Sequence, residues 1–448
     1  MKYLIRLIIG ASLAFFATVS SAGDKAAFRD AFLAGQLSYD DVLAAAAEEG
    51  EVNWFYWGGS QAYNGWVESY VRSELKAVGI ELNVRHLTNT RDAVDLVLAE
   101  AGVGRGLGEG SVDAIWINGE NFYTLGENDL LFGSFATLLP SAANFIWDPA
   151  NPASGANNFD FGYPTEAREM PWGSAQYLCA IDTSRLDPAD APSTLAELES
   201  WMETNPGRFT YVAPPHFMGN TFVQEVMYLT NPDGTGHAPF MNSAQSLGAA
   251  EIARLTKPGF EFLKRIEANV VGGKNPDYPK NPDANKALIA NGEADIICRF
   301  GVGTTSVDVK NGHLPPTMQN IILPVGGLIQ NKNFIGIPGN CPNPAAALVL
   351  ANLIGSVDGQ ISWMENIGGV SGMDAPALSA ADQARVAEAM PDTMGVSIAD
   401  VSSNTVPDTN ASLVDILEGT WIDYIQRADT ERSFEQIVAD VFAAKHPE

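Results

Sequence analysis

The segment whose side chains are best suited to chemistry is short and polar, and it comprises Asn118, Gly119, Glu120, Asn121 and Phe122. It follows residues 112–117, an apolar run of β-branched and aromatic residues that predicts a strand buried on both faces of a parallel sheet. In open α/β sheets, ligands bind outside the carboxyl ends of the strands. Two amides, a carboxylate and a ring at such an edge can bind a small molecule. The alternative is a turn whose polar groups satisfy one another.

Similar aromatic, amide and glycine groups follow other predicted strands or open a predicted helix. The free N–H groups at that helix start, residues 216–220, favour a negative or acceptor group on a ligand. A ring over a cationic ligand adds about 1 kcal/mol of cation–π attraction. The candidate ligand-binding residues are Trp57, Gly58, Gly59, Ser60, Asn89, Thr90, Asn118, Gly119, Glu120, Asn121, Phe122, Trp172, Gln176, Tyr177, His216, Gly219, Asn220, Arg299 and Phe300.

Each candidate also has a purely structural interpretation. Core packing is the alternative for the aromatic residues, a solvated charge is the alternative for Glu120, and pairing with an acid is the alternative for Arg299. Trp57 and Trp172 adjoin glycines at the ends of predicted elements, and for these two a binding role and core packing are equally consistent with the position.

Signatures of catalysis and of metal binding are missing from the sequence. There is no G-x-S-x-G or H-E-x-x-H motif, and the five histidines lack ligand spacing: His86, His216, His237, His313 and His446. The glycine-rich run at residues 102–110 does not match a dinucleotide-binding loop, because it leads from a helix into a strand. We therefore expect neither an enzyme nor a cofactor. A hydrolase whose distant residues converge in space is the alternative.

The N-terminus has the pattern of a secretory signal peptide over residues 1–22. Lys2 and Arg6 precede an apolar stretch, and small residues at 20–22 form a cleavage site before Gly23. No later apolar stretch reaches the length of about 20 residues that spans a membrane. We expect an exported periplasmic protein without stable membrane insertion. The net charge of −28 excludes nucleic acid as a partner, and its field concentrates cations near the protein. The alternative is that this charge serves solubility alone.

The chain has 448 residues, more than one hydrophobic core usually supports, so at least two lobes are expected. Residues 52–57, 80–84 and 112–117 are predicted strands, and residues 64–78 and 90–101 are the helices between them. This alternation is typical of βαβ units with a parallel sheet. Further predicted strands are residues 174–181, 209–213, 295–299, 321–324 and 333–337. Further predicted helices are residues 258–271, 344–354, 413–428 and 434–444, and one more that the tight loop of residues 214–220 opens and that ends at Leu229.

Three cysteines are too few for a disulfide scaffold, and the odd number leaves at least one thiol unpaired. Cys298 and Cys341 could pair in an oxidising compartment, although the sequence does not fix their separation. Cys179 lies in an apolar run, where cysteine usually behaves as a small hydrophobic residue.

Four segments carry a resemblance to a known family. They are W-G-G at residues 57–59, S-V-D-A-I-W-I-N-G-E-N-F at 111–122, P-W-G-S-A-Q-Y at 171–177 and N-P-A-A-A-L-V-L-A-N-L-I-G-S at 343–356. With the export signal, they resemble the extracellular solute-binding proteins of ABC importers, in particular the YnjB-like branch. The resemblance covers nearly the whole mature chain, and I-W-I-N-G-E-N-F is its most specific piece.

The resemblance implies an α/β protein with the type II periplasmic-binding fold, two lobes, a hinge and a C-terminal helical extension. The first lobe would comprise residues 23–175 and 335–448, and the second lobe residues 176–334. Two crossover segments would join the lobes near residues 175–181 and 321–334, and the C-terminal helices would return to the first lobe. The protein, as a monomer, would close around a solute and dock on an inner-membrane permease.

The family does not fix the solute. This branch is loosely associated with thiamine-type import, and relatives carry polyamines, iron or sugars. The aromatic residues and the acidity favour a cationic organic solute, and the helix opening at Gly219 and Asn220 could hold a phosphate or hydroxyl group. A thiamine-like solute satisfies both expectations. A metal-binding or polyamine-binding import protein is the alternative.

Overall fold

The computed structural model describes residues 22–151 and 154–445. The predicted signal peptide, apart from Ala22, lies outside the described residues, as does His446. The strands are β1 Glu51–Trp57, β2 Glu81–Leu87, β3 Ala114–Ile117, β4 Phe159–Asp160, β5 Tyr163–Pro164, β6 Glu169–Asp182, β7 Ile296–Phe300, β8 Met318–Ile321, β9 Leu328–Gly336, β10 Val370–Ser371 and β11 Thr405–Val406.

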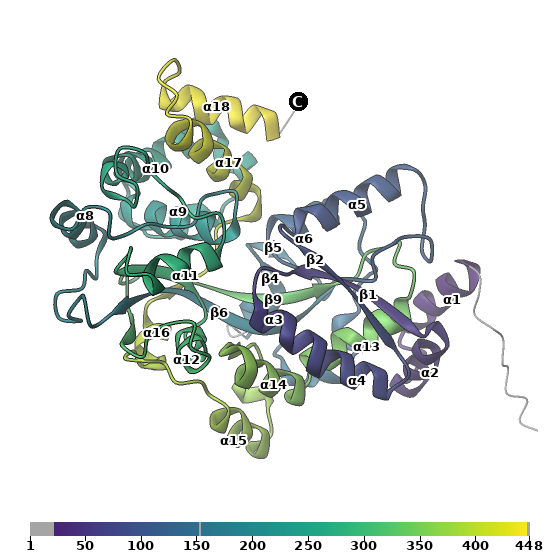
Figure 1. Cartoon of the computed structure of the whole chain (residues 1–448). Coiled ribbons are helices and arrows are strands. Elements are labelled where there is room, and N and C mark those ends of the chain that lie inside the picture. The colour runs from purple at the N-terminus through teal and green to yellow at the C-terminus, as the bar shows by residue number, and fades with distance from the viewer. Residues whose placement is uncertain (1–21, 152–153, 446–448) are drawn as a thin grey trace, which may run out of the picture.

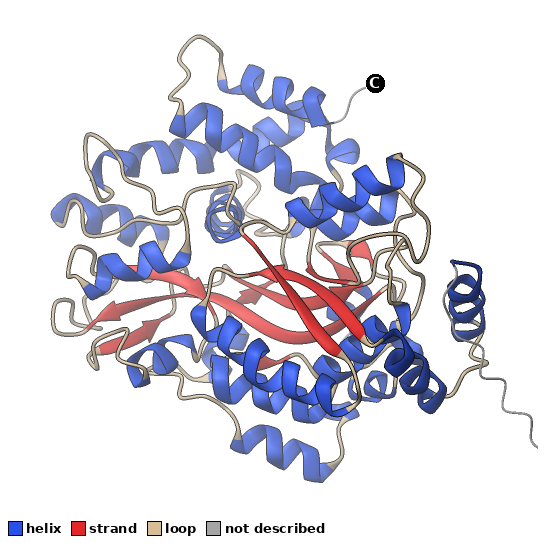
Figure 2. Ribbon diagram, turned by 45° about the vertical axis from the view of Figure 1, so that its right-hand side comes forward, coloured by secondary structure: helices blue, strands red, loops and turns tan. Residues whose placement is uncertain are grey.

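Helices cover both faces of the sheet, as Figure 2 shows. The α-helices are α1 Ala22–Leu33, α2 Tyr39–Glu49, α3 Gln61–Trp66, α4 Arg72–Ala77, α5 Arg91–Gly102, α6 Glu120–Glu127, α7 Gly155–Asn158, α8 Leu195–Thr204, α9 Phe217–Thr230, α10 Ala244–Ile266, α11 Pro282–Ala290, α12 Thr304–Lys310, α13 Pro344–Gly355, α14 Val357–Ile367, α15 Ala380–Glu388, α16 Ile398–Ser403, α17 Ala411–Trp421 and α18 Phe434–Lys445. Two π-helical segments, Val67–Val71 and Ile422–Gln426, continue α3 into α4 and extend α17.

Local sequence signals set several of these boundaries. Ser38 and Asp41 form a capping box at the start of α2, and Thr194 and Glu197 form another at the start of α8. Gly50 ends α2 with φ 74°, a left-handed conformation that glycine adopts without a Cβ penalty. The chain can therefore turn directly from α2 into β1.

The main sheet has the strand order β10-β6-β9-β3-β1-β2. Strands β1, β2 and β3 are parallel, as their alternation with helices predicts, whereas β9 is antiparallel to β3 and β6. Strand β6 pairs with β9 up to Gln176, and from Tyr177 onward it pairs with β7 and β8. The long strands β6 and β9 therefore run from one half of the molecule into the other, at the crossovers that the sequence predicts (Figure 1).

Two large hydrophobic cores lie on either side of these crossover strands. One core surrounds β1 and α13 and contains Trp54, Trp172 and Leu348, and we call this half the first lobe. The other surrounds α9 and α10 and contains Phe222 and Leu263, and we call it the second lobe. Each lobe buries its own apolar side chains, so the two can move as separate bodies around the crossovers.

The C-terminal helices pack differently from the expectation. Leu417 and Trp421 of α17 and Val438 of α18 belong to the core of the second lobe, where α18 lies along α10 (Figure 1). The Trp421 indole nitrogen donates a hydrogen bond to the Tyr211 hydroxyl at 2.9 Å. The expectation that these helices return to the first lobe is therefore wrong, because their apolar faces complete the second core.

Three further expectations are corrected. Residues 209–213 form no strand, and Phe209 makes isolated bridges to Val270 and Ile296. The predicted helix at residues 258–271 covers the second part of α10, which begins at Ala244, contains Pro258 and ends at Ile266, so the predicted end is five residues too late. The polar segment at residues 118–122 is a short turn followed by the first residues of α6, because helix φ/ψ angles already begin at Glu120.

The disulfide joins Cys179 to Cys298, so the suggested pairing of Cys298 with Cys341 is wrong. The register of β6 against β7 places Cys179 directly opposite Cys298. Cys341 is a free, buried thiol in the core of the first lobe, and it therefore lies in the other half of the molecule.

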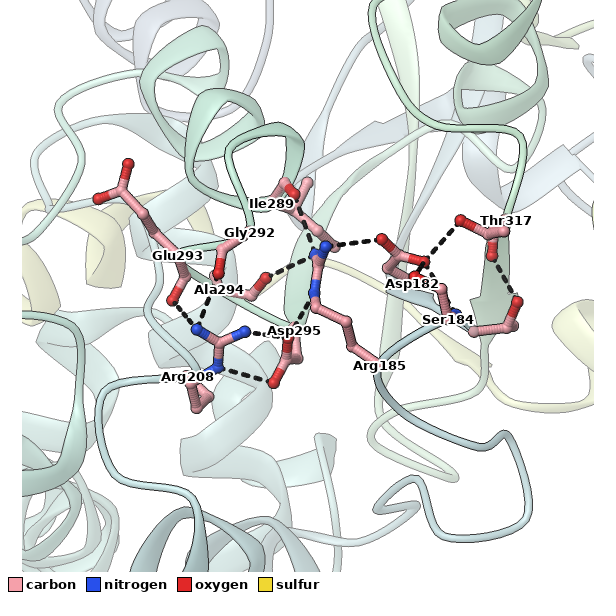
Figure 3. A network of polar contacts seen from close by, with 11 residues as sticks. Asp182, Ser184, Arg185, Arg208, Ile289, Gly292, Glu293, Ala294, Asp295 and Thr317 are labelled. Carbon is pink, nitrogen blue, oxygen red and sulfur yellow. Dashed lines mark hydrogen bonds and ion pairs between the residues drawn. The ribbon is translucent and has the colours of Figure 1, made fainter.

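A group of ion pairs in the second lobe, drawn in Figure 3, ties the end of β6 to the start of β7. Arg185 lies 2.8 Å from both Asp182 and Asp295, and Arg208 donates to Asp295 from its Nε at 2.8 Å. Burial raises the pKa of Asp295, but the two arginines lower it by a larger amount, so the pKa lies below its usual value. These charges are mutually satisfied and stabilise the lobe.

Within the described ranges, no single helix is long and apolar enough to cross a membrane. Together, α13 and α14 have the length and the apolar composition of a membrane span, but the chain bends by 64° between the two helices.

Candidate functional site

A cavity of about 500 Å³ lies between the two lobes. The first lobe contributes the end of β1, the start of α6 and the loop before α5, and the second lobe contributes α9, β7, α12 and α17. Twelve of the sequence-predicted residues line it: Trp57, Gly59, Ser60, Asn89, Thr90, Asn118, Glu120, Asn121, His216, Asn220, Arg299 and Phe300.

Seven predicted residues do not line the cavity: Gly58, Gly119, Phe122, Trp172, Gln176, Tyr177 and Gly219. Gly119 and Gly219 have backbone roles next to the cavity wall. A Cβ at Gly219 would lie 2.2 Å from the Val212 carbonyl oxygen, so glycine is what lets α9 begin against that loop. The Gly119 N–H donates to Asp160 Oδ2 at 2.6 Å and fixes the turn before α6.

Trp172 is a core residue. Its side chain is fully buried, and its ring lies 4.7 Å from Trp363 and 5.9 Å from Trp66, centroid to centroid. Phe122 and Tyr177 are also fully buried within hydrophobic clusters, and Gln176 is buried beside the crossover strand β9. These side chains pack in the protein interior, which was the alternative interpretation of each. At Trp172, a neighbouring glycine was therefore not a sign of a binding role.

Trp57 forms the aromatic wall of the cavity at the carboxyl end of β1. Its ring centroid lies 5.4 Å from that of Phe217 and 5.7 Å from that of Tyr63, both close to perpendicular. A Cβ at Gly59 would lie 2.4 Å from this ring, so glycine is required where the indole folds over the backbone. His216 completes the wall at 6.1 Å from Trp57. The wall joins rings from both lobes.

His216 is neutral at pH 7, because burial lowers its pKa to about 4. Its Nδ1 accepts the N–H of Met218 at 3.2 Å as the N-cap of α9. The proton therefore sits on Nε2, which is buried without a partner. His216 supplies one N–H donor to an acceptor group of a solute.

The basic residues of the cavity are engaged with acids of the protein. Arg299 donates to Asp308 at 2.5 Å and to the Thr305 hydroxyl at 3.1 Å, and Lys286 lies 3.0 Å from Asp283. Burial raises the pKa of Asp308, but the charge and hydrogen bond of Arg299 outweigh this effect, so the pKa lies below its usual range. Arg299 thus pairs with an acid, as its structural alternative predicts, although it also lines the cavity.

Two carboxylates of the cavity wall, Glu120 from α6 and Glu418 from α17, have no ion-pair partner among the described residues. Burial raises the pKa of Glu120 to about 7, and the charge of Asp415 adds to this effect. Burial also raises the pKa of Glu418 well above its usual value, and the charges of Glu120 and Asp415 raise it further. A cation placed between them would relieve both effects.

The amide oxygens of the wall add to this demand for a donor. The Asn121 side-chain nitrogen donates to Glu120 Oε1 at 2.7 Å, which leaves the Asn121 oxygen pointing elsewhere, buried and without a partner. The Asn220 side-chain oxygen, from the opposite lobe, is likewise buried and unpartnered. An N–H or O–H group on a solute would satisfy these acceptors, which are costly to leave unpaired.

Sequence reasoning missed several lining residues. Phe217 adjoins His216 and could have been included as its neighbour. Trp116 lies inside the apolar run of residues 112–117, and Tyr63 stands just before the predicted helix of residues 64–78, so neither position indicated a binding role. Asp415, Glu418 and Lys445 gave no signal, because their helices were expected on the other lobe. No group of three or more His, Cys, Asp or Glu in residues 22–151 and 154–445 is placed to hold a metal ion.

The fold and the cleft between lobes define a type II periplasmic binding protein. Residues 70–391 match the family of bacterial extracellular solute-binding proteins, and the chain belongs to this family. It is 32% identical over 315 residues to Protein YnjB of Escherichia coli strain K12. The aligned region covers 70% of this chain and 76% of that protein.

Solved structures support the fold. A putative spermidine/putrescine ABC transporter from Listeria monocytogenes has a TM-score of 0.55 at 12% identity, over 89% of this chain and 99% of that one. An ABC transporter from Clostridium perfringens also has a TM-score of 0.55, at 13% identity, over 84% and 99% of the two chains. The family match and the relative together identify the chain as the solute-binding component of an ABC transporter, a class that binds small ligands and delivers them to a permease. Membership of this extracellular family implies a periplasmic location.

Proposed function

We propose that this protein captures an organic cation with an aromatic ring, of the thiamine type, in the cavity between its lobes. The observation that carries the proposal is the imbalance of the polar groups on the wall. Arg299, Lys286 and Lys445 are each paired with an acid of the protein, whereas Glu120 and Glu418 are not. Glu120 and Glu418 are the cavity groups that a neighbouring positive charge would keep ionised, so a cationic solute completes the site.

The aromatic wall favours a flat cation over an aliphatic one. Trp57, Tyr63, Phe217 and Phe300 present rings to a cavity whose size suits a molecule of this class. Stacking and cation–π contact with such rings contribute about 1 to 2 kcal/mol when water is excluded. The Nε2–H donor of His216 is available for a hydroxyl or phosphate group at the other end of the solute.

A polyamine is the second candidate, because Asp415 adds a third carboxylate beside Glu418. A polyamine would use the acidic residues and offer the aromatic wall ammonium and methylene groups, but no ring to stack on it. Competition between the two solutes therefore distinguishes the candidates. We further propose that the precursor carries a signal peptide at residues 1–22, that the mature protein is a monomer, and that it releases its solute unchanged to the permease.

A thermal-shift panel followed by calorimetric titration tests the proposal. A solute that binds only the folded state raises the melting temperature by mass action. The panel contains thiamine and its phosphates, putrescine, spermidine, neutral sugars and divalent metals, and mass spectrometry of the recovered solute checks that it is unchanged. Stabilisation by thiamine compounds above that by spermidine is expected. Stabilisation by sugars or metals alone would refute the proposal.

A further inference from the structure

Helices α17 and α18 form a hairpin whose open end reaches the cavity. Arg432 fixes the closed end, with its guanidinium 2.7 Å from Asp423, 2.8 Å from Asp429 and 3.0 Å from Asp440. Along its length the two helices approach closely, because a Cβ at Gly419 would lie 2.7 Å from Val441 Cγ1. The hairpin is therefore held at a fixed angle, and α18 points its last residues toward the first lobe (Figure 1).

Lys445, the last residue of α18, brings an ammonium group of the protein itself to the acidic part of the cavity. Its Nζ lies 2.8 Å from Asp415 Oδ2, and Lys445, Asp415 and Glu418 all line the cavity. Asp415 and Glu418 are three residues apart, so they lie on one face of α17. The charge of Lys445 also acts on Glu418, whose pKa it lowers against the larger effect of burial.

We propose that Lys445 is a specificity-determining residue that occupies the place of a second ammonium group, so that the cavity accepts an organic monocation and discriminates against polyamines. This inference rests on the proposed function. With Lys445 in place, Asp415 is paired, and the two carboxyl groups that are left without an ion-pair partner, Glu120 and Glu418, together form the site for one cation.

The geometry explains why the lysine can be removed without loss of the fold. The side chains of Lys445 and Asp415 are 45% and 30% exposed, and an ion pair of that exposure contributes little to stability. The apolar contacts of α18 with α10 and α17 hold the helix. Without the lysine charge, Asp415 and Glu418 present two adjacent carboxylates, which is what a linear diamine or triamine requires.

The test is calorimetric titration of the full mature chain and of Lys445→Gln with thiamine, putrescine and spermidine. The variant should bind spermidine about tenfold more tightly relative to thiamine than the wild type does, which corresponds to the removal of one partly screened charge–charge repulsion. Lys257→Gln is the matched control. Lys257 of α10 pairs with Glu435 of α18 at 2.7 Å and does not line the cavity, so the selectivity of Lys257→Gln should equal that of the wild type.

The outcomes separate this inference from the proposed function. If the wild type binds thiamine and Lys445→Gln shows the same ratio of affinities, the role of Lys445 is refuted and the proposed function stands. An equal change of the affinity ratio in Lys257→Gln also refutes it, because the effect would then come from a weaker attachment of α18 to α10. If no amine or thiamine compound binds either protein, both proposals fall.

Discussion

Glu120 of α6 and Glu418 of α17 line the same cavity from opposite lobes, and the charge of Glu120 raises the pKa of Glu418. Closure of the lobes therefore brings two carboxyl groups toward each other in a partly desolvated space. Like charges in such a space repel unless a proton or a cation lies between them. A cationic solute that bridges the lobes stabilises the closed form, which couples binding to the hinge motion.

Replacement of either carboxylate should weaken binding of a cationic solute. We expect Glu120→Gln and Glu418→Gln to lower the affinity for thiamine by about tenfold each, the effect of losing one partly buried charge pair of about 1.4 kcal/mol. Calorimetric titration measures this loss. Glu435→Gln on α18 removes an exposed carboxylate that pairs with Lys257, and it should leave the affinity unchanged. Unchanged affinity in both cavity variants would contradict the proposed site.

The affinity should also depend on pH through Glu120. Its carboxyl group has a pKa of about 7, raised mainly by burial, so it is protonated in most molecules below that pH. A cation binds the ionised form, and affinity should therefore fall as the pH drops from 8 through 7 to 5. Titrations across this range in wild type and Glu120→Gln give the test, because the variant should lose the part of the dependence that belongs to Glu120 and keep the part that belongs to Glu418. An affinity that rises toward pH 5 would contradict it.

The sequence predicts the fold better than it predicts the site. Alternating apolar runs and capping residues fix β1, β2 and α5 locally, and so their positions follow from pattern alone. The site depends on contacts between distant segments. Glu418 lies some 300 positions from Glu120, and its helix was expected on the first lobe, because an amphipathic helix shows which face is apolar but not which core it completes.

Aromatic residues show the same limit. Trp57 and Trp172 both adjoin glycines at the end of a predicted element, yet one lines the cavity and the other lies in a core. Trp172 lies at an irregularity in the register of β6 between Pro171 and Ser174, and no periodic pattern reveals which core such a side chain enters. The cysteine pairing was similarly hidden, because it follows from the register of β6 against β7.

Substitution of these two tryptophans should therefore separate binding from stability. Trp57→Ala removes a ring from the cavity wall and should weaken binding of thiamine by about tenfold with a modest effect on stability. Trp172→Ala opens a cavity among Trp66, Trp116 and Trp363 and should cost about 3 to 5 kcal/mol of unfolding free energy. Urea unfolding and titration of both variants provide the comparison. The interpretation fails if Trp172→Ala is as stable as the wild type.

The disulfide should stabilise the second lobe. The double substitution of Cys179 and Cys298 by Ala opens a crosslink between positions 119 residues apart and should lower the unfolding free energy by about 2 to 4 kcal/mol. Thiol titration of the unreduced wild type should detect one thiol, that of Cys341, and only after unfolding, because this residue is buried. Three reactive thiols, or one that reacts in the native state, would contradict the assignment.

Two buried glutamates should respond in opposite directions to the same substitution. Both carboxyl oxygens of Glu169 are buried without a hydrogen-bond partner, and burial, followed by the charge of Asp160, raises its pKa well above the usual value. A carboxyl group whose pKa is higher in the folded state stabilises the protein below its unfolded pKa, and this contribution is lost as the pH rises toward the folded pKa. Glu169→Gln supplies a neutral group of the same shape. It should raise the unfolding free energy at pH 8 by about 1 to 3 kcal/mol, and the gain should vanish near pH 4.

Glu100 is the matched control, because it is buried but fully partnered. Its oxygens accept hydrogen bonds from Arg105 at 2.8 Å, from the Ser111 hydroxyl at 2.6 Å and from Asn340 at 3.0 Å. Glu100→Gln turns an amide N–H₂ toward these donors, and it should lower the unfolding free energy by about 2 to 3 kcal/mol at pH 8. Urea unfolding at pH 4 and pH 8 measures both variants. Destabilisation of Glu169→Gln at pH 8 would show that this carboxylate has a native partner. It would contradict the interpretation that Glu169 is a buried acid without a partner.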